Sequence, residues 1–162
     1  MNDVMDTLAR LPPGSALAEL RRQRPEVVKH LQGSDDAIFS PADDGGLTRT
    51  ERAAAALRAA TLLRDPVLSE HYRARLAALD PEGTLAKTVE GTARITEARW
   101  DAILAHVDLV TRGPGSAERK DIDNLYAVGL SSHAVVSLSQ LIAYVNFQSR
   151  VLAGLRMLKG DR

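Results

Sequence analysis

The 162-residue sequence contains no cysteine. A chain without thiols cannot form a disulfide, bind a metal through thiolates or run a dithiol redox cycle. The four histidines are His30, His71, His106 and His133. None has a second ligand at i, i+4 spacing together with the acids that a helical metal site needs, and no glycine-rich phosphate loop is present. We therefore predict no metal site and no cofactor.

The sequence also lacks an excess of charge of either sign. Lys and Arg together number 21, as do Asp and Glu, so the formal net charge is zero. A helix-turn-helix pattern that includes Leu125, Gly129 and Val135 is the one hint of DNA binding. However, the segment from Asp121 to Ser149 has no Lys or Arg to contact phosphates. We therefore predict no nucleic-acid partner.

Long apolar runs are missing as well. The N-terminal residues MNDVMDTLARLPPG include acids and no continuous apolar stretch, so no secretory signal is expected. No window of the sequence approaches the length of an apolar membrane span. The expectation is a cytoplasmic protein with no membrane partner.

The residues that are abundant favour helices. Hydrophobic residues make up 44% of the chain but aromatic residues only 4%, and alanine, leucine and arginine dominate. The length fits one domain with its own core. We predict an all-α fold of about seven to eight helices in a single domain over residues 1–162, with residues 1–14 as an N-terminal extension and 15–158 as the core.

Local signals mark where the helices begin. Thr48 and Glu51 form a capping-box pattern, which explains Glu51 without any catalytic role. Asp65 and Pro66 supply the cap and first residue of the next helix. Further helices are expected after Ser15, at Pro25, near Trp100, after Ser116 and after Ser131 or Ser132.

The helix that begins at Pro66 carries the first candidate site. Helical spacing puts Leu68, Tyr72, Arg75 and Leu79 on one face, with His71 at its edge. An imidazole in a cleft beside an arginine suits acid-base work. A single helical histidine is more often a structural residue, and both interpretations stay open.

The final helix, about residues 132–158, is apolar almost all round, which is typical of a central or interfacial helix. This apolar surface predicts that the chain forms a homo-oligomer through its final helix. A polar row at spacings of three and four interrupts it, and Asn146 and Arg150 form a separate i, i+4 pair. The row is either the wall of a pocket or, as we favour, a set of hydrogen bonds across a helix or subunit contact; it comprises His133, Ser137, Gln140, Tyr144 and Gln148.

Two segments, LTRTERAAAALRAATLLRDPVLSEHYRARLAAL and GLSSHAVVSLSQLIAYVNFQSRVLAGL, resemble the two halves of a carboxymuconolactone decarboxylase (CMD) domain. That family includes the alkylhydroperoxidase D (AhpD) proteins. The resemblance covers roughly residues 15–158. It implies a compact AhpD-like helical domain that assembles into trimers or hexamers through its helices.

In the peroxidase branch of that family, a glutamate precedes a Cys-x-x-Cys-x-x-x-His motif. His71 matches the histidine, the two cysteine positions fall at Arg64 and Val67, and the acid falls near Glu51. Neither Arg64 nor Val67 can form a sulfenic acid or a disulfide. The resemblance therefore excludes the thiol peroxidase mechanism for this chain.

The decarboxylase branch does not need the cysteine pair. Resemblance to it implies a cofactor-free reaction on a small carboxylate-bearing molecule, with His71 as acid or base and Arg75 or Arg150 holding the carboxylate. Glu51 is the second candidate catalytic residue. The expected substrate-binding residues are Tyr72, Arg75, Tyr144, Asn146 and Arg150. The alternative is a non-catalytic binding or assembly partner of a cysteine-bearing AhpD-like peroxidase. A pocket around His71 favours the first, and packed, hydrogen-bonded side chains favour the second.

Overall fold

The structure is a computed structural model that describes residues 3–91 and 96–160. Within these ranges it is helical throughout, which confirms the all-α prediction. The helices are α1 (Val4–Leu8), α2 (Ala16–Arg22), α3 (Pro25–Phe39), α4 (Arg49–Leu62), α5 (Pro66–Ala77), α6 (Thr84–Val89), α7 (Ala98–Arg112), the 3-10 turn η1 (Pro114–Ser116), α8 (Arg119–Ala127) and α9 (Ser132–Lys159). The short helix α6 was not predicted from the sequence.

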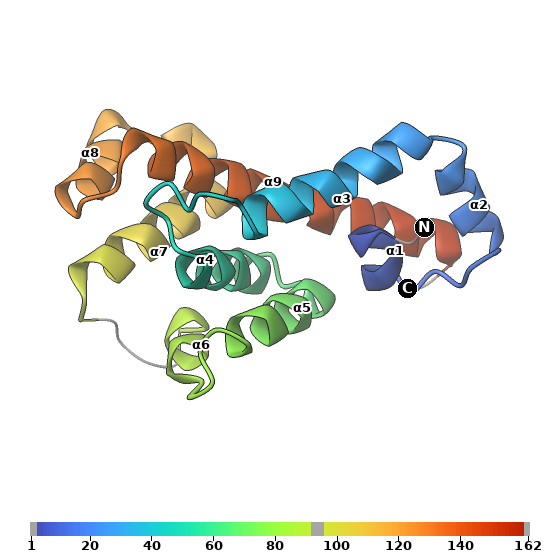
Figure 1. Cartoon of the computed structure of the whole chain (residues 1–162), viewed down its shortest axis with the longest axis horizontal. Helices are drawn as coiled ribbons and strands as arrows, with labels where there is room; N and C mark the ends of the chain where they lie inside the picture. Colours follow the sequence, from blue (N-terminus) through green and yellow to red (C-terminus); the bar gives the residue numbers. More distant parts are fainter. Residues whose placement is uncertain (1–2, 92–95, 161–162) are drawn as a thin grey trace.

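Helix α4 is the centre of the fold. It lies between α5 and α7, with α9 across it (Figure 1). Small side chains make this possible, because alanine lets neighbouring helices approach closely. The buried apolar residues of α4 are Ala53, Ala54, Ala55, Ala56, Leu57, Ala59 and Ala60.

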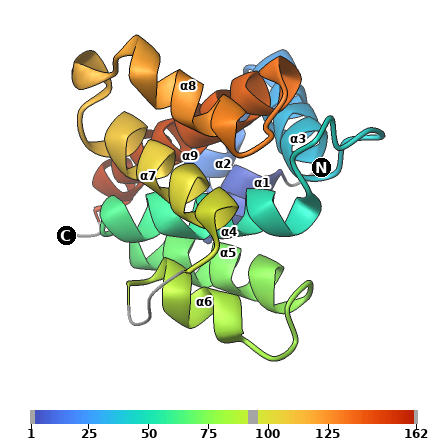
Figure 2. The ribbon, with the colours of Figure 1, turned by 90° about the vertical axis from the view of Figure 1, so that its left-hand side faces the viewer.

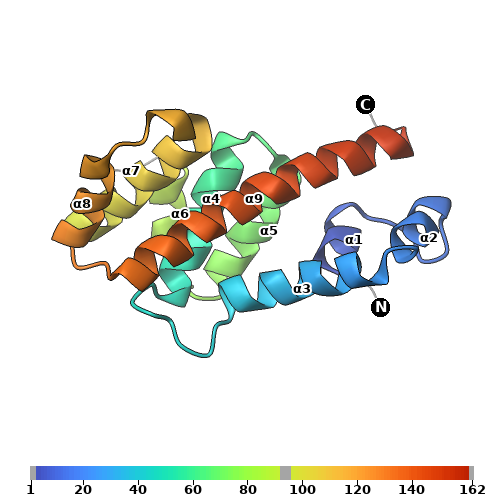
Figure 3. The same ribbon diagram turned by 90° about the horizontal axis from the view of Figure 1, so that it is seen from above.

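Helix α9 has 28 residues and joins two parts of the molecule. Its first half crosses α4 and α7, and its second half runs toward α1 and α2 (Figure 3). Leu138, Ile142 and Val145 are fully buried, whereas Val136 and Phe147 are 53% and 44% exposed. The helix is therefore central on one face and open to solvent on another.

Residues of the expected N-terminal extension pack into the same core. Met5 is fully buried and Leu8 is 7% exposed. Arg21 of α2 forms ion pairs with Asp3 and Asp6, which holds α1 and α2 together. Residues 1 and 2 of that extension lie outside the described ranges.

Most of the predicted helix starts are confirmed. Thr48 and Glu51 form the capping box of α4, and Asp65 accepts hydrogen bonds from the first turn of α5. Ser131, not Ser132, caps α9 by accepting a hydrogen bond from the Ala134 N–H group. These caps depend on residues a few positions apart, so the sequence contains the signal for them.

Two local predictions were wrong. Ser116 was expected to cap the helix that follows it, but it lies in η1. The N-cap residue of α8 is Glu118, which forms a capping box with Asp121. Leu79, which was expected on one face with Leu68 and Tyr72, is 42% exposed, and Leu76 of α5 is buried instead. The helix ends at Ala77, so Leu79 no longer follows the helical repeat.

Across the described ranges, no helix combines the length and apolar character needed to cross a membrane.

Candidate functional site

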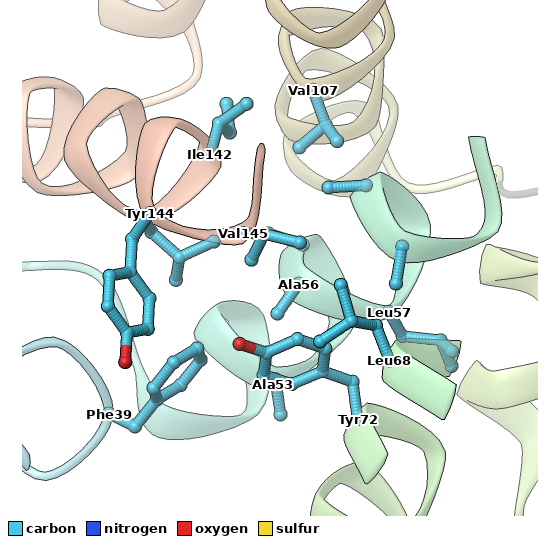
Figure 4. Close-up of a cluster of buried hydrophobic side chains, with 14 of the residues drawn as sticks. Phe39, Ala53, Ala56, Leu57, Leu68, Tyr72, Val107, Ile142, Tyr144 and Val145 are labelled. Atoms are coloured by element: carbon cyan, nitrogen blue, oxygen red, sulfur yellow. The ribbon is translucent and has the colours of Figure 1, made fainter. Parts of the chain in front are cut away.

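A group of polar and aromatic side chains lies where α3, α5 and α9 meet. Figure 4 shows Phe39 of α3, Tyr72 of α5 and Tyr144 of α9 side by side at the edge of the aliphatic core. We call this group the Tyr72 cluster; its members are Asp35, Phe39, His71, Tyr72, Arg75, Tyr144 and Gln148. It contains four of the seven predicted site residues.

Tyr72 is the centre of this cluster. Its side chain is fully buried, and its hydroxyl donates a hydrogen bond to Oε1 of Gln148. The ring centroid lies 5.3 Å from that of Phe39. Burial, and then the negative charge of Asp35, raise the pKa of Tyr72 well above its ordinary value. The phenol therefore stays neutral and acts as a hydrogen-bond donor.

Arg75 is held by two neighbours on α3. Its Nη2 atom lies 2.8 Å from Oδ2 of Asp35, whose side chain is 6% exposed. Its guanidinium carbon lies 4.1 Å from the centroid of the Phe39 ring, which is a cation-π contact. The charge that was expected to bind a substrate carboxylate is thus already paired within the chain.

His71 is half-buried, and its ring centroid lies 4.9 Å from that of Tyr72. Burial lowers its pKa, Arg75 lowers it further, and Asp35 opposes both. The ring is therefore neutral near pH 7. Its Nε2 atom is buried without a hydrogen-bond partner, as are Oδ1 of Asp35 and Nε2 of Gln148.

The other predicted binding residues of α9 bond to backbone. The Tyr144 hydroxyl donates to the Leu31 carbonyl oxygen at 3.4 Å, and burial raises the pKa of Tyr144. Asn146 donates to the Ile142 carbonyl at 2.9 Å, and the exposed Arg150 donates to the Asn146 carbonyl at 2.9 Å. Tyr144 thus joins the cluster, whereas Asn146 and Arg150 bond along their own helix.

Glu51 is placed elsewhere. Its carboxylate accepts hydrogen bonds from Thr48 and from Arg99, whose Nε lies 2.5 Å from Oε1. Burial opposes ionisation of Glu51, but the hydrogen bonds from Arg99 and Thr48 outweigh burial and lower its pKa. Arg99 also donates to the Gly46 carbonyl at 2.6 Å. Glu51 therefore joins the starts of α4 and α7, and the structure does not bring it to His71.

A structural ion pair begins between the two positions matched to the family's cysteines, Arg64 and Val67. Arg64 is exposed with a positive φ of 56°, and Val67 is partly buried at the start of α5. Between them, the Asp65 carboxylate receives two hydrogen bonds from Arg156, each 3.0 Å long. This pair ties the beginning of α5 to the end of α9.

A shallow groove of about 280 Å³ borders the cluster. Asp35, Asp36, Arg49 and Arg75 line it, so its charges balance. His71 is not among the lining residues. A small carboxylate in this groove would lie near two arginines and two aspartates. The imidazole of His71, four residues before Arg75 on α5, would not line its site.

Sequence reasoning missed Asp35 and Phe39. Their signal was present, because Leu31, Asp35 and Phe39 recur at the four-residue spacing of a helix face. An aspartate within such an apolar stripe is expected to be buried and paired. For metals, no group of three His, Asp or Glu side chains in residues 3–91 and 96–160 is arranged to hold an ion.

The fold and this site define an all-helical protein. The fold is similar to that of an uncharacterized peroxidase-related protein from Silicibacter sp. TM1040, with a TM-score of 0.73. The match covers 80% of this chain and 68% of that chain at 16% sequence identity, so the likeness lies in the fold. The sequence matches no protein-family model and no curated protein.

Proposed function

We propose that this chain is a cysteine-free relative of the CMD and AhpD-like proteins that acts by binding and assembly, not by catalysis. One observation carries the proposal. The groups expected to assist His71 all have partners within the chain: Glu51 with Arg99, Arg75 with Asp35, and Tyr72 with Gln148. An acid-base residue whose neighbours are engaged in this way resembles a packed structural histidine more than a catalytic one.

The exposed face of α9 is the surface that we propose for assembly. Five exposed positions follow one another at spacings of three and four and therefore share that face; they are Val136, Gln140, Ala143, Phe147 and Arg150. Val136 and Phe147 leave large apolar groups in water. Burying such groups against a second chain stabilises an oligomer.

Light scattering coupled to gel filtration tests the assembly. We expect the mass of an oligomer, which is at least twice the 17.5 kDa of one chain. The Val136→Glu/Phe147→Glu variant should run as a monomer, because two charges would be buried in the contact. The matched control is Val27→Glu/Leu20→Glu, which changes residues that are 55% and 51% exposed on α3 and α2 and should leave the mass unchanged.

A monomeric wild-type chain would rule out self-assembly. The proposed partner would then be a cysteine-bearing AhpD-like protein of the same genome, tested by co-expression and co-elution. Failure to co-elute would reject the partner role too. In a coupled assay with an organic hydroperoxide and a dithiol, the purified chain should not exceed the buffer rate, because it has no cysteine.

One observation favours catalysis as the second candidate. The Nε2 atom of His71 is buried without a partner, and Arg75 lies one turn away. In this candidate, a small carboxylic acid binds beside Arg75 and His71 accepts a proton from it. Native mass spectrometry tests the idea: a retained acid that disappears in His71→Ala would support it, and a clean apo protein would reject it.

A further inference from the structure

Another histidine, His106, is buried away from the Tyr72 cluster. It lines a groove of about 430 Å³ between α7 and α8. These two helices lie next to each other on the side of the molecule shown in Figure 2. The volume is within the range of small-molecule sites, roughly 300–1,000 Å³. We call it the α7/α8 groove.

Hydrogen bonds determine which nitrogen of His106 carries the proton. Nε2 of His106 lies 3.2 Å from Oγ of Ser139, which in turn lies 3.0 Å from the Val135 carbonyl oxygen. Two oxygens this close need a proton between them, and the hydroxyl has only one. Ser139 therefore donates to Val135 and accepts from His106. The neutral ring carries its proton on Nε2, and Nδ1 keeps a free lone pair.

That lone pair is an unusual feature. His106 is 5% exposed, and its Nδ1 atom is buried without any hydrogen-bond partner. Buried polar groups in folded proteins nearly always have a partner, since an unpaired one is destabilising. Nδ1 is an acceptor in this tautomer, so the matching group on a ligand must be an N–H or O–H donor.

The charge of the groove selects among such donors. Its polar lining consists of Asp101, Asp121, Asn124 and His106, and its other lining residues are alanines, a leucine and a valine. One oxygen of Asp121 accepts the Glu118 N–H group at 2.8 Å, which leaves its other oxygen for a ligand. Two carboxylates with no lining Lys or Arg favour a cation, and the alanine walls suit a short aliphatic chain.

We propose that the α7/α8 groove binds a small organic ammonium compound, a primary or secondary amine with a short aliphatic body. An ammonium N–H group donates to Nδ1 of His106, and Asp101 and Asp121 balance the charge. The alanine side chains of α7 and α8 contact the aliphatic part. This site is separate from the Tyr72 cluster and does not depend on the role proposed for the whole chain.

An NMR titration of the full chain with n-butylammonium tests the site. We expect saturable shifts of backbone amides in α7 and α8. Tetramethylammonium has the same charge but no N–H donor, so it should bind about tenfold more weakly, the usual effect of one lost hydrogen bond. Butyrate should cause no saturable shift. Equal responses to the three probes, or none to butylammonium, would overturn the proposal.

Three variants test which residues of the groove contact the ligand. His106→Gln keeps a donor for Ser139 but loses the Nδ1 acceptor, and it should weaken butylammonium binding at least tenfold. Asp101 is exposed, so Asp101→Asn leaves the fold intact and should weaken binding several-fold. Asp123→Asn, at an exposed residue that does not line the groove, is the matched control. Unchanged binding in Asp101→Asn, or equal loss in Asp123→Asn, would contradict the assignment.

Discussion

His71 and His106 share two features but lie in different surroundings. Burial lowers the pKa of both, and each has one buried ring nitrogen without a partner. Their surroundings differ. His71 packs against Tyr72 near a paired arginine and aspartate, whereas His106 lines an open groove whose carboxylates face solvent. The two histidines therefore differ in what surrounds them: His106 borders a groove, and His71 lies among packed side chains.

The two regions also use charge differently. In the Tyr72 cluster, the charges of Arg75 and Asp35 balance each other. In the α7/α8 groove, Asp101 and Asp121 have no cation among the lining residues. The first arrangement stabilises the contact between α3 and α5, and the second leaves a field that attracts a ligand. The predictions below test this difference.

The largest effect is expected from breaking the partly buried ion pair between Arg75 and Asp35. Arg75→Ala leaves Asp35 charged and unpaired, which should lower the free energy of unfolding by about 3 kcal/mol, the low end for such a change because Arg75 is partly exposed. Arg73 on the same helix pairs with Glu90 at the surface, so Arg73→Ala should lower it by less than about 1 kcal/mol. Urea denaturation measures both. Equal losses of unfolding free energy in Arg75→Ala and Arg73→Ala would mean that the Arg75–Asp35 pair contributes no more than a surface ion pair.

A smaller effect is expected from the hydrogen bond between Tyr72 and Gln148. Tyr72→Phe leaves the buried Gln148 amide without its donor and should lower the free energy of unfolding by about 2 kcal/mol. Adding Gln148→Met removes the unpaired amide and should recover part of the loss. Tyr126→Phe, at a 42% exposed tyrosine on α8, is the control. A double variant less stable than Tyr72→Phe would show that Gln148 has other essential contacts.

The smallest effect is a dependence of stability on pH. The folded pKa of both His71 and His106 lies below the ordinary value of 6.5. The unfolded chain therefore binds more protons, and the free energy of unfolding falls as the pH drops below about 6.5, until the folded rings are also protonated. Urea midpoints between about pH 7 and 5 measure the slope, since unfolded histidines titrate there.

The variants His71→Gln and His106→Gln divide that slope between the two sites. Each should flatten it, and the double variant should flatten it most. A slope that stays unchanged in the double variant would assign the pH dependence to other groups. Butylammonium should raise the urea midpoint of His71→Gln but not of His106→Gln, which separates the two regions directly.

Local features were predictable from sequence because they depend on nearby residues. The Thr48 and Glu51 capping box and the Asp65 cap are each decided within a few positions. The candidate site was predictable only in part. His71, Tyr72 and Arg75 share one helix, so their spacing brought them together, but their partners come from α3 and α9.

The sequence by itself determined that this protein is helical and that it has no thiol, since composition and local spacing decide both. Only the tertiary structure decided what the remaining polar groups do. Tyr72 and Gln148 are 76 positions apart, Glu51 and Arg99 are 48 apart, and Asp35 and Arg75 are 40 apart. Helix packing sets such pairs, because burial requires each polar group to find a partner wherever the fold brings one near.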